Sequence, residues 1–318
     1  MSRAGDLLPP IFIERLRKII PSGQIQTVLR TFEHPKPTTF RVNTLKTTPE
    51  AVKEQLVAEG FKLERVAWYH DAMILRGGRL RELQETTLYQ NGTIYVQSLS
   101  SMLPPLVLAP QPGESILDIA AAPGSKTTQM ACLMRGEGRI VANDSNRIRF
   151  FKLKANLTQQ AAVNVEATLY YGEMFGKRHP GAFDRVLVDV PCTTEGRFET
   201  SDPKTYRFWQ PRKIHEMVRK QRRLLVSAIE ALRPGGVLVY ATCTFAPEEN
   251  EGIVSIVLEQ FGDAVALEPI NLQFSNTLPG LTSWERYRFD PSMKLARRVF
   301  PTEEMEGFFL AKLRKRDK

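Results

Sequence analysis

The chain has few cysteines and no long hydrophobic run. Its 318 residues include only three cysteines, Cys132, Cys192 and Cys243, which excludes a disulfide framework, and no Cys-x-x-Cys pair or His/Cys cluster points to a metal. No apolar run approaches the roughly 18 residues of a membrane span, so we expect no membrane partner. The first ten residues lack the charged and then apolar pattern of a secretory signal. We therefore expect a cytoplasmic protein whose cysteines stay reduced.

Acidic residues are in the minority. The chain has 44 lysines and arginines against 35 aspartates and glutamates, a net charge of +9, and a pI of about 9.5. This excess suits a polyanionic partner such as nucleic acid, although a generally basic soluble enzyme is the alternative. Hydrophobic residues make up 42% of the chain, which is enough to exclude a disordered protein and to build one large or two modest domains.

The pattern of the first 88 residues indicates a small α/β module. Apolar residues recur at near-helical spacing up to about residue 35, and a short strand is expected at 38–42. Thr48 fits the N-cap of the next helix, with Pro49 in its first turn. Short strands separated by polar turns are expected over 61–97.

From about residue 89 the pattern changes to alternating strands and helices. We expect helices over 125–134 and 211–232. Such alternation implies a parallel sheet with helices on both faces, and we assign residues 89–318 to one α/β domain. The expected strands are 115–119, 139–142, 184–188, 237–240 and 307–313.

Small residues follow the first strand of that domain. Residues 120–127 read Ala-Ala-Ala-Pro-Gly-Ser-Lys-Thr, which matches neither the Walker loop nor Gly-x-Gly-x-x-Gly. In open parallel sheets, ligands bind where strand ends meet helix starts, and small residues let a ligand approach the backbone. Asp144 follows the next strand, where an acid can bind a ribose. We predict an adenosine-bearing cofactor without pyrophosphate; the alternative is an ordinary turn with a surface aspartate.

Two of the three cysteines come directly after expected strands. Cys192 lies in Asp-Val-Pro-Cys-Thr at 189–193, and Cys243 lies in Ala-Thr-Cys-Thr at 241–244. Both should therefore lie at the sheet edge that carries the small-residue loop. A free cysteine is more often a small buried core residue, and we give that role to Cys132, which falls within an apolar helix turn. The positions of the other two favour chemistry.

These motifs are similar to those of the Sun/Nol/Nop-type RNA cytosine-5 methyltransferases. The similarity covers nearly the whole chain and implies S-adenosyl-L-methionine as cofactor. It also implies the α/β class I methyltransferase fold, which is Rossmann-like with a mostly parallel seven-stranded sheet. Residues 89–318 would form the catalytic methyltransferase domain and residues 1–88 an N-terminal RNA-binding module. The similar segments are 41–46, 95–104, 120–127, 189–193, 242–244, 247–251 and 307–311.

The resemblance implies different roles for the two cysteines. Carbon 5 of cytosine is a poor nucleophile, and a thiolate that adds to carbon 6 makes the ring electron-rich so that carbon 5 can attack a methyl group. The family's nucleophile corresponds to Cys243, while Cys192 corresponds to the cysteine that aids breakdown of the covalent adduct. DNA cytosine-5 methyltransferases attack with a Pro-Cys cysteine instead, so sequence spacing alone does not choose between Cys243 and Cys192.

The resemblance also implies which side chains surround the base and the cofactor. Asp189 would hydrogen-bond the cytosine and Lys126 would pair with it; the alternative is a plain surface ion pair. Ser125 stands where the family usually has glycine, and Glu173 where it often has aspartate, so both positions stay polar. The implied cofactor contacts are Ala120, Ala121, Ala122, Pro123, Gly124, Ser125, Lys126, Asp144, Glu173 and Asp189.

A basic run between the two cysteine motifs is the expected RNA contact. Its aromatic residues would stack on unpaired bases; the alternative is a solvated helix face with the aromatic residues in the core. Arg41, Asn43 and Lys46 lie in the segment that faces RNA in the family. The cations of the run are Lys204, Arg207, Arg212, Lys213, Arg219, Lys220, Arg222 and Arg223, and the aromatic residues are Phe198, Tyr206, Phe208 and Trp209.

Three functions fit the sequence. The first is methyl transfer to carbon 5 of a cytosine in rRNA or tRNA, a base that must be unpaired or flipped out to be reached. The second is an RNA-binding ribosome-assembly factor whose catalysis is dispensable or lost, and the third is a methyltransferase acting on DNA or another pyrimidine. The joint presence of Lys126, Asp189, Cys192 and Cys243 favours the first.

Overall fold

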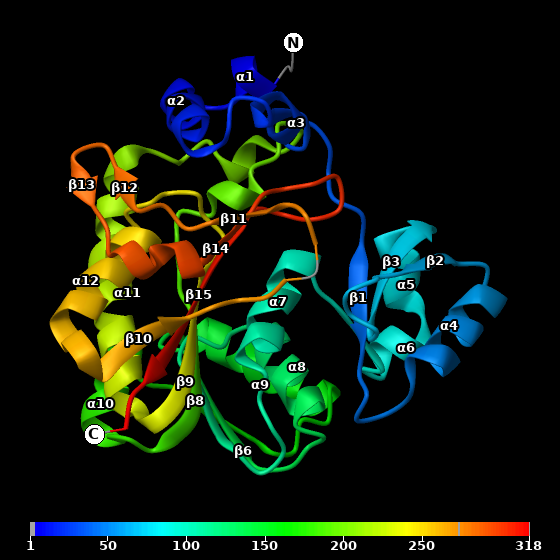
Figure 1. Ribbon diagram of the computed structural model, residues 1–318. Helices are drawn as coiled ribbons and strands as arrows, with labels where there is room; N and C mark the ends of the chain where they lie inside the picture. Colours follow the sequence, from blue (N-terminus) through cyan, green and yellow to red (C-terminus); the bar gives the residue numbers. More distant parts are fainter. Residues whose placement is uncertain (1–3, 273, 318) are drawn as a thin grey trace. The chain divides into compact units, whose positions relative to one another are not determined.

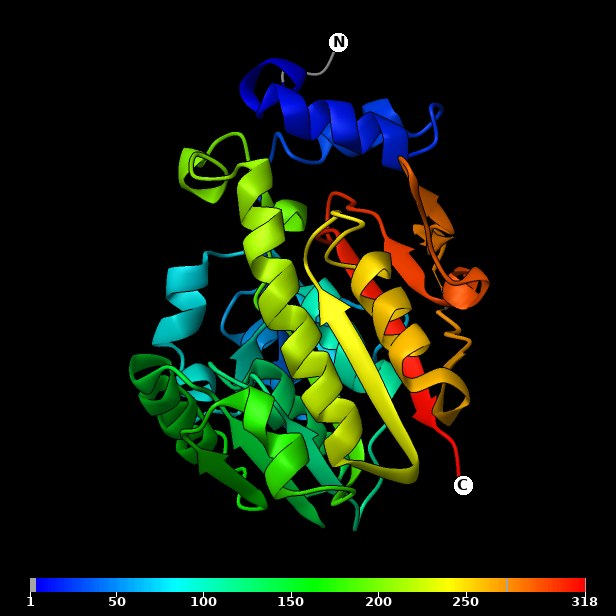
Figure 2. The same cartoon turned by 90° about the vertical axis from the view of Figure 1, so that its left-hand side faces the viewer.

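The computed structural model describes residues 4–272 and 274–317, which divide into two compact units built from separate segments. The core unit comprises residues 37–189, 226–239 and 314–318. The cysteine-pair unit comprises residues 1–36, 190–225 and 240–313. Helix α11 (Pro211–Ala231) and strands β9 (Leu232–Thr242) and β15 (Phe308–Lys315) run through both. Figure 2 shows β9, in yellow, running back along α11, in yellow-green.

A small antiparallel sheet forms the first part of the core unit (Figure 1). Its strand order is β2-β3-β1-β4, and three helices pack against it around a buried cluster that includes Phe40, Leu56, Met73 and Leu83. Thr48 caps the first of these helices by accepting a hydrogen bond from the backbone N–H of Ala51. The elements are β1 (Thr39–Val42), α4 (Pro49–Ala58), β2 (Lys62–Arg65), β3 (Ala72–Gly77), α5 (Leu80–Glu85), α6 (Thr87–Gln90) and β4 (Ile94–Val96).

A parallel sheet forms the second part of the core unit. Strand β5 pairs in parallel with β6 on one side and β8 on the other, and β6 pairs in parallel with β7. All four strands therefore end at the same edge of the sheet. The elements are α7 (Leu99–Leu108), β5 (Ser115–Asp118), α8 (Ser125–Leu133), β6 (Arg139–Asn143), α9 (Arg147–Gln159), β7 (Val165–Thr168), α10 (Phe175–Arg178) and β8 (Phe183–Asp189).

The cysteine-pair unit is built around an aromatic core. Phe12 lies 4.8 Å from Phe198 and 6.5 Å from Phe245 between ring centroids, so helices near the N-terminus pack against segments that follow β8 and β9. The elements are α1 (Ala4–Leu7), α2 (Pro10–Ile19), α3 (Ile25–Arg30), α12 (Glu251–Phe261), β10 (Val265–Glu268), β11 (Thr277–Pro279), β12 (Ser283–Trp284), β13 (Tyr287–Arg288) and β14 (Arg297–Val299).

The main sheet has nine strands among the described residues, two more than expected. Its order is β11-β14-β15-β9-β8-β5-β6-β7, with β10 also paired to β15. Strands β5, β6, β8, β9 and β15 correspond to the five strands located from the sequence, whereas β7 and β10 were not located from it. Strands β14 and β11 extend the sheet through antiparallel pairing. Sequence patterning missed this extension because these strands have only three residues each.

Residue 88 is not a boundary between the compact units. The small sheet continues past it, since β4 at 94–96 pairs with β1. The first 36 residues belong to the other unit, because their apolar side chains pack with Phe198, Phe245, Trp284 and Phe300. The functional division into residues 1–88 and 89–318 stays a prediction.

A buried ion pair ties α12 to β14 within the cysteine-pair unit. Both nitrogens Nε and Nη2 of Arg298 contact the carboxylate of Glu251, the first at 2.6 Å, and both side chains are almost completely buried. Nη1 of Arg298 also donates to the backbone carbonyl of Phe245 at 2.9 Å. Removing one partner would leave a buried charge without its counter-ion.

We expect Arg298→Met to lower the free energy of unfolding by about 3–5 kcal/mol, measured by urea denaturation, because Glu251 would lose its counter-ion. The double variant Arg298→Met/Glu251→Gln should recover part of this loss. The exposed Arg81→Gln serves as control and should change the stability by less than about 0.5 kcal/mol. A loss as small as that of the control would contradict the structural role of the pair.

Candidate functional site

The small-residue loop connects the end of β5 to α8 in the core unit. Gly124, at the N-cap of α8, has φ +106°, and a Cβ there would lie 2.9 Å from Cδ1 of Leu153, so the position requires glycine. Helix α9 supports the loop, because Arg149 donates to the carbonyl of Ala122 and Asn156 donates to that of Pro123 at 2.8 Å. The loop therefore has a fixed backbone at the edge where the parallel strands end.

The other predicted cofactor contacts also follow strands that end at this edge. Asp144 comes directly after β6, and Glu173 follows β7 in a 3-10 turn at 172–174. The carboxylate of Asp144 accepts a hydrogen bond from the backbone N–H of Asn146 at 2.9 Å and lies 3.3 Å from Nε of Arg149. These residues share one edge, as expected from the parallel order, while their cofactor contacts stay predictions.

Lys126 and Asp189 form an ion pair between α8 and the end of β8. Nζ of Lys126 lies 2.7 Å from Oδ2 of Asp189 and donates to Oγ of Ser101 at 2.8 Å. Lys126 is buried and Asp189 is partly exposed, so the pair is not a freely solvated surface contact. The lysine thus holds the Asp189 carboxylate in one position at the sheet edge.

Asp118, the last residue of β5, is a candidate site residue that the sequence analysis did not single out. Its Oδ2 accepts a hydrogen bond from Oγ1 of Thr127 at 2.6 Å, and its buried Oδ1 has no hydrogen-bond partner among the described residues. The pKa of Asp118 is raised to about 7, mainly by burial and also by the charge of Asp189. Its position at a strand end before the small-residue loop was the available signal.

The two cysteines predicted to be reactive lie against each other in the cysteine-pair unit. Their sulfur atoms are 3.4 Å apart, and neither forms a disulfide. The pKa of the Cys192 thiol is raised well above its ordinary value, first by the hydrogen bond with Cys243 and then by burial. Cys132 is separate, because it is buried in the core unit and its Sγ contacts Oδ1 of Asn43 at 3.3 Å.

Buried carboxyl groups surround the cysteine pair. Glu249 accepts hydrogen bonds from Thr193, which follows Cys192, and Glu195 accepts one from the backbone N–H of Phe245 at 3.0 Å. Burial is the main cause that raises the pKa of both glutamates, that of Glu249 to about 8. Sequence reasoning gave these two residues no role, although Glu249 lies in the Pro-Glu-Glu-Asn-Glu segment at 247–251.

A cavity of about 470 Å³ lies beside Cys192 in the cysteine-pair unit. Phe208 is 63% exposed, and the guanidinium of Arg207 lies 4.5 Å from the centre of its ring. The expectation that Phe198 stacks on RNA is wrong, because this side chain is buried in the aromatic core. The cavity is lined by Cys192, Thr193, Thr194, Lys204, Thr205, Phe208, Trp209, Lys213, Glu216 and Met217.

Arg41 and Asn43 are not exposed to solvent, so the expectation that they face RNA is wrong. Both are fully buried. Arg41 donates to Oε1 of Gln97 at 3.0 Å and to the carbonyl of Ser125 at 3.2 Å, and so braces the first turn of α8. Asn43 donates to the carbonyl of Gln160 at 2.7 Å. Lys46 is exposed, but its Nζ already contacts two backbone carbonyls.

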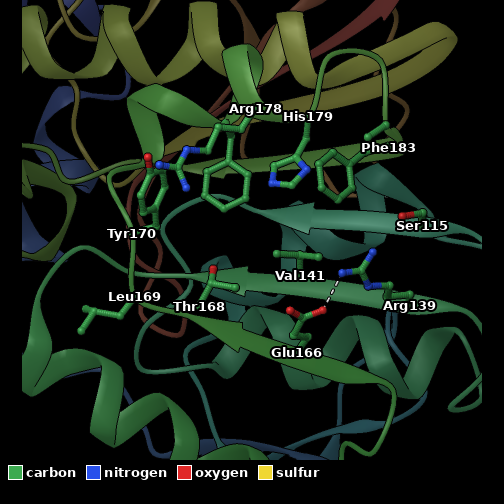
Figure 3. A pocket seen from close by; sticks show the side chains of 12 residues that line it. Ser115, Arg139, Val141, Glu166, Thr168, Leu169, Tyr170, Arg178, His179 and Phe183 are labelled. Carbon is green, nitrogen blue, oxygen red and sulfur yellow. Dashed lines mark hydrogen bonds and ion pairs between the residues drawn. The ribbon is translucent and has the colours of Figure 1, made fainter.

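A second cavity, of about 380 Å³, lies on one face of β6 and β7 in the core unit (Figure 3). Arg178 stacks over the ring of Tyr170 at 4.1 Å, and the ion pair between Arg139 and Glu166 spans 2.5 Å on the exposed strand face. None of the predicted site residues lines this cavity.

Two further kinds of feature are missing from residues 4–272 and 274–317. No group of three or more His, Cys, Asp or Glu side chains is arranged there to hold a metal ion. Within the same residues, no helix is long and apolar enough to cross a membrane.

Comparison with known protein families shows the family of the chain. Residues 105–314 match the model of the 16S rRNA methyltransferases RsmB/F. The chain belongs to this family. Residues 8–99 match the N-terminal domain of the 16S rRNA methyltransferase RsmF. The family to which the sequence motifs pointed is thereby confirmed.

Individual members of the RsmB/F family and related proteins resemble the chain over almost its whole length. It is 37% identical over 313 residues to the ribosomal RNA small subunit methyltransferase F of Serratia proteamaculans, which covers 97% of this chain and 63% of that protein. It is 39% identical over 310 residues to the tRNA (cytosine(49)-C(5))-methyltransferase of Pyrococcus abyssi, which covers 95% of both. The chain thus spans less than two thirds of the length of the first relative.

Solved structures confirm the predicted methyltransferase fold. A methyltransferase homolog from Pyrococcus horikoshii is 33% identical with a TM-score of 0.81, and the match covers 97% of this chain and all of that one. The structure of NSun6 from Pyrococcus horikoshii with SFG has the same fold, with a TM-score of 0.82 at 23% identity over 99% of this chain and all of that one.

The raised pKa of Asp118 predicts a pH-dependent stability. Because the folded-state pKa is about 7 and the ordinary value is 3.8, this group stabilises the fold below about pH 4, and the contribution disappears as the pH rises through 7. The unfolding free energy of the wild type should therefore fall as the pH rises from 4 to 8, and that of Asp118→Asn should lack this fall. The difference between the two proteins should change by about 4 kcal/mol over this range.

Urea denaturation at stepped pH measures this difference. Thr127→Val serves as a second variant, since it removes the hydrogen bond that lowers the pKa of Asp118 and should move the fall to higher pH. A difference between wild type and Asp118→Asn that stays constant with pH would contradict the assignment.

Proposed function

We propose that this chain transfers a methyl group from S-adenosyl-L-methionine to carbon 5 of a cytosine in rRNA or tRNA. The observation that carries the proposal is the pair of free cysteines, Cys192 and Cys243, with sulfur atoms 3.4 Å apart. Membership in the RsmB/F family supports RNA as the substrate. One relative is named for rRNA and another for tRNA, so both RNA classes belong to the proposal.

The residues at the carboxyl edge of β5, β6, β7 and β8 fit S-adenosyl-L-methionine chemically. The buried Oδ1 of Asp118, which has no partner among the described residues, suits the cationic end of this molecule. The cofactor supplies an electrophilic methyl group when bound. Residues that would hold it are Ala120, Ala121, Ala122, Pro123, Gly124, Ser125, Lys126, Asp144, Glu173 and Asp189.

The chain's own residues would activate the cytosine. The thiolate of Cys243 adds to carbon 6, which makes carbon 5 nucleophilic toward the methyl group. After methyl transfer a base removes the proton of carbon 5 as the bond between carbon 6 and the Cys243 sulfur breaks, and Cys192 aids this release. Asp189 hydrogen-bonds the base and favours its electron-withdrawn form, while Lys126 keeps the carboxylate oriented through their 2.7 Å contact. No metal takes part in this proposal.

RNA would be held mainly by the basic run, with the target cytosine unpaired or flipped out. The exposed Phe208, next to Arg207 and Lys213, offers a stacking surface beside the cavity that contains Cys192. Residues 1–88 would act as the RNA-binding module and 89–318 as the catalytic domain. The proposed reaction requires free thiols, which fits a location in the reducing cytoplasm.

We expect Cys243→Ala to lower methylation by about a thousandfold or more, because the nucleophile is lost. Cys192→Ala should instead trap a protein–RNA adduct that survives denaturing gels, since release is impaired. Both variants are incubated with labelled S-adenosyl-L-methionine and total RNA, followed by nucleoside analysis and gel electrophoresis. Cys132→Ala, which changes the remaining cysteine, is the control and should keep the methylation activity.

The outcomes separate the candidate functions. If Cys243→Ala is active and Cys192→Ala forms no adduct, the roles of the two cysteines are the reverse of those proposed. RNA binding without labelled 5-methylcytidine in any RNA fraction would favour an assembly factor. Label in DNA instead of RNA would favour a methyltransferase that acts on DNA.

RNA affinity should fall steeply with salt because the basic run neutralises phosphates. We expect Lys204→Gln/Arg207→Gln to lower the slope of log affinity against log salt by about 1 to 2, as measured by filter binding. The control Arg139→Gln/Arg233→Gln removes two exposed cations that each pair with a carboxylate outside the basic run and outside residues 1–88, and should leave the slope unchanged. Equal slopes for both double variants would contradict the role of the run.

A further inference from the structure

One buried carboxyl group links the two segments that carry the cysteines. Glu249 is completely buried in the cysteine-pair unit. It accepts hydrogen bonds from the backbone N–H of Thr193 at 3.1 Å and from the Thr193 hydroxyl. Gln221, on α11, donates to the same carboxyl group at 2.7 Å. Glu249 therefore has a defined place and orientation beside residue 193.

The link continues to the second cysteine segment. Oγ1 of Thr193 lies 2.8 Å from Oγ1 of Thr244, and these threonines directly follow Cys192 and Cys243. A chain of hydrogen bonds thus runs from Glu249 through Thr193 to Thr244. It holds together the two loops whose sulfur atoms are 3.4 Å apart.

We propose that Glu249 is a positioning residue that, when ionised, helps to keep Cys192 in the thiol form and thereby favours Cys243 as the sulfur atom that attacks. This inference rests on the proposed function and deepens it. It gives a physical reason for the division of roles, which the sequence spacing left open. In the thiol form Cys192 can donate its proton toward the sulfur of Cys243.

The electrostatic surroundings support this role. The pKa of Cys192 is raised by its hydrogen bond with Cys243, by burial, and by the negative charges of Cys243 and Glu249. The pKa of Glu249 is itself raised to about 8, mainly by burial and also by the charge of Glu195. Other titratable groups near this cluster are Tyr240 on β9 and Glu251 on α12, which pairs with Arg298. Lys204, Lys213 and Glu216 line the cavity beside Cys192.

The proton on Glu249 also sets the direction of the hydrogen bonds. As a carboxylate, Glu249 accepts from the Thr193 hydroxyl, which can then accept from Thr244. As a carboxylic acid it can donate to Thr193, which then donates to Thr244. A change of charge at Glu249 is therefore felt at the residue next to Cys243 as well as at Cys192.

Alkylation of the whole protein with iodoacetamide, quantified for each cysteine by peptide mass spectrometry from pH 6 to 11, tests the proposal. Below about pH 7 Glu249 carries no charge, so wild type and Glu249→Gln should react alike at Cys192. Above about pH 8 the charge of Glu249 holds back ionisation of Cys192 only in wild type. At pH 9 we expect Cys192 of the variant to react about tenfold faster, because a larger fraction of its thiol is ionised once the charge of Glu249 is gone.

Glu248→Gln is the matched control, because Glu248 is the preceding residue and pairs instead with Arg15 at 2.6 Å. It should give the wild-type profile at Cys192, and Cys132 serves as an internal reference in every sample. Thr193→Val is a second variant that leaves Glu249 in place. It removes a hydrogen bond that lowers the pKa of Glu249, so the carboxyl stays neutral to higher pH and Cys192 should again react faster at pH 9.

Identical Cys192 profiles in wild type, Glu249→Gln and Thr193→Val, with unchanged circular dichroism, would overturn the proposal. If Glu249→Gln does not fold, the Thr193→Val profile decides the question alone. The readout needs neither RNA nor methyl transfer. An enzyme that methylates RNA but shows identical profiles would refute the role of Glu249 and leave the proposed function intact, while the expected profiles without methylation would refute the function alone.

Discussion

The backbone hydrogen bonds that pair β5 in parallel with β6 and β8 constrain where the core unit can place reactive side chains. Parallel strands end at one edge, so each loop that follows a strand emerges there. The small-residue loop, Asp144 and Asp189 occupy that edge for this reason alone. The packing of α9 against the loop, through Arg149 and Asn156, then holds the backbone in a single conformation that a bound cofactor would not have to impose.

Burying carboxyl groups costs free energy, and the structure meets this cost with hydrogen bonds. Glu251 has the guanidinium of Arg298, Glu195 has the indole N–H of Trp209, and Glu249 has Thr193 and Gln221. Asp118 keeps one oxygen without a partner among the described residues. Buried groups with raised pKa values concentrate at functional sites, because the same low-dielectric surroundings tune acids and thiols.

Much of the fold followed from local patterns. The Thr48 cap, the helix that begins at Ser125 and the strands around 115–119 and 139–142 were all correctly predicted, because each depends on hydrophobic spacing or capping within a few residues. The short strands β11 and β14 escaped prediction because they owe their conformation to pairing with distant segments. Arg41 and Phe198 were misplaced for a related reason: an arginine or an aromatic ring is exposed or buried according to what packs on it.

The sequence alone determined the chemistry that the chain can offer: small residues after one strand, an aspartate and a lysine near it, and a cysteine after each of two further strands. These features depend on the composition and the order of the residues, which can be read without knowledge of the fold. Only the tertiary structure decided that the two sulfur atoms lie in contact and that the buried Glu249 accepts hydrogen bonds from Thr193. Those contacts join residues 51 to 56 positions apart, and no local pattern encodes such a distance.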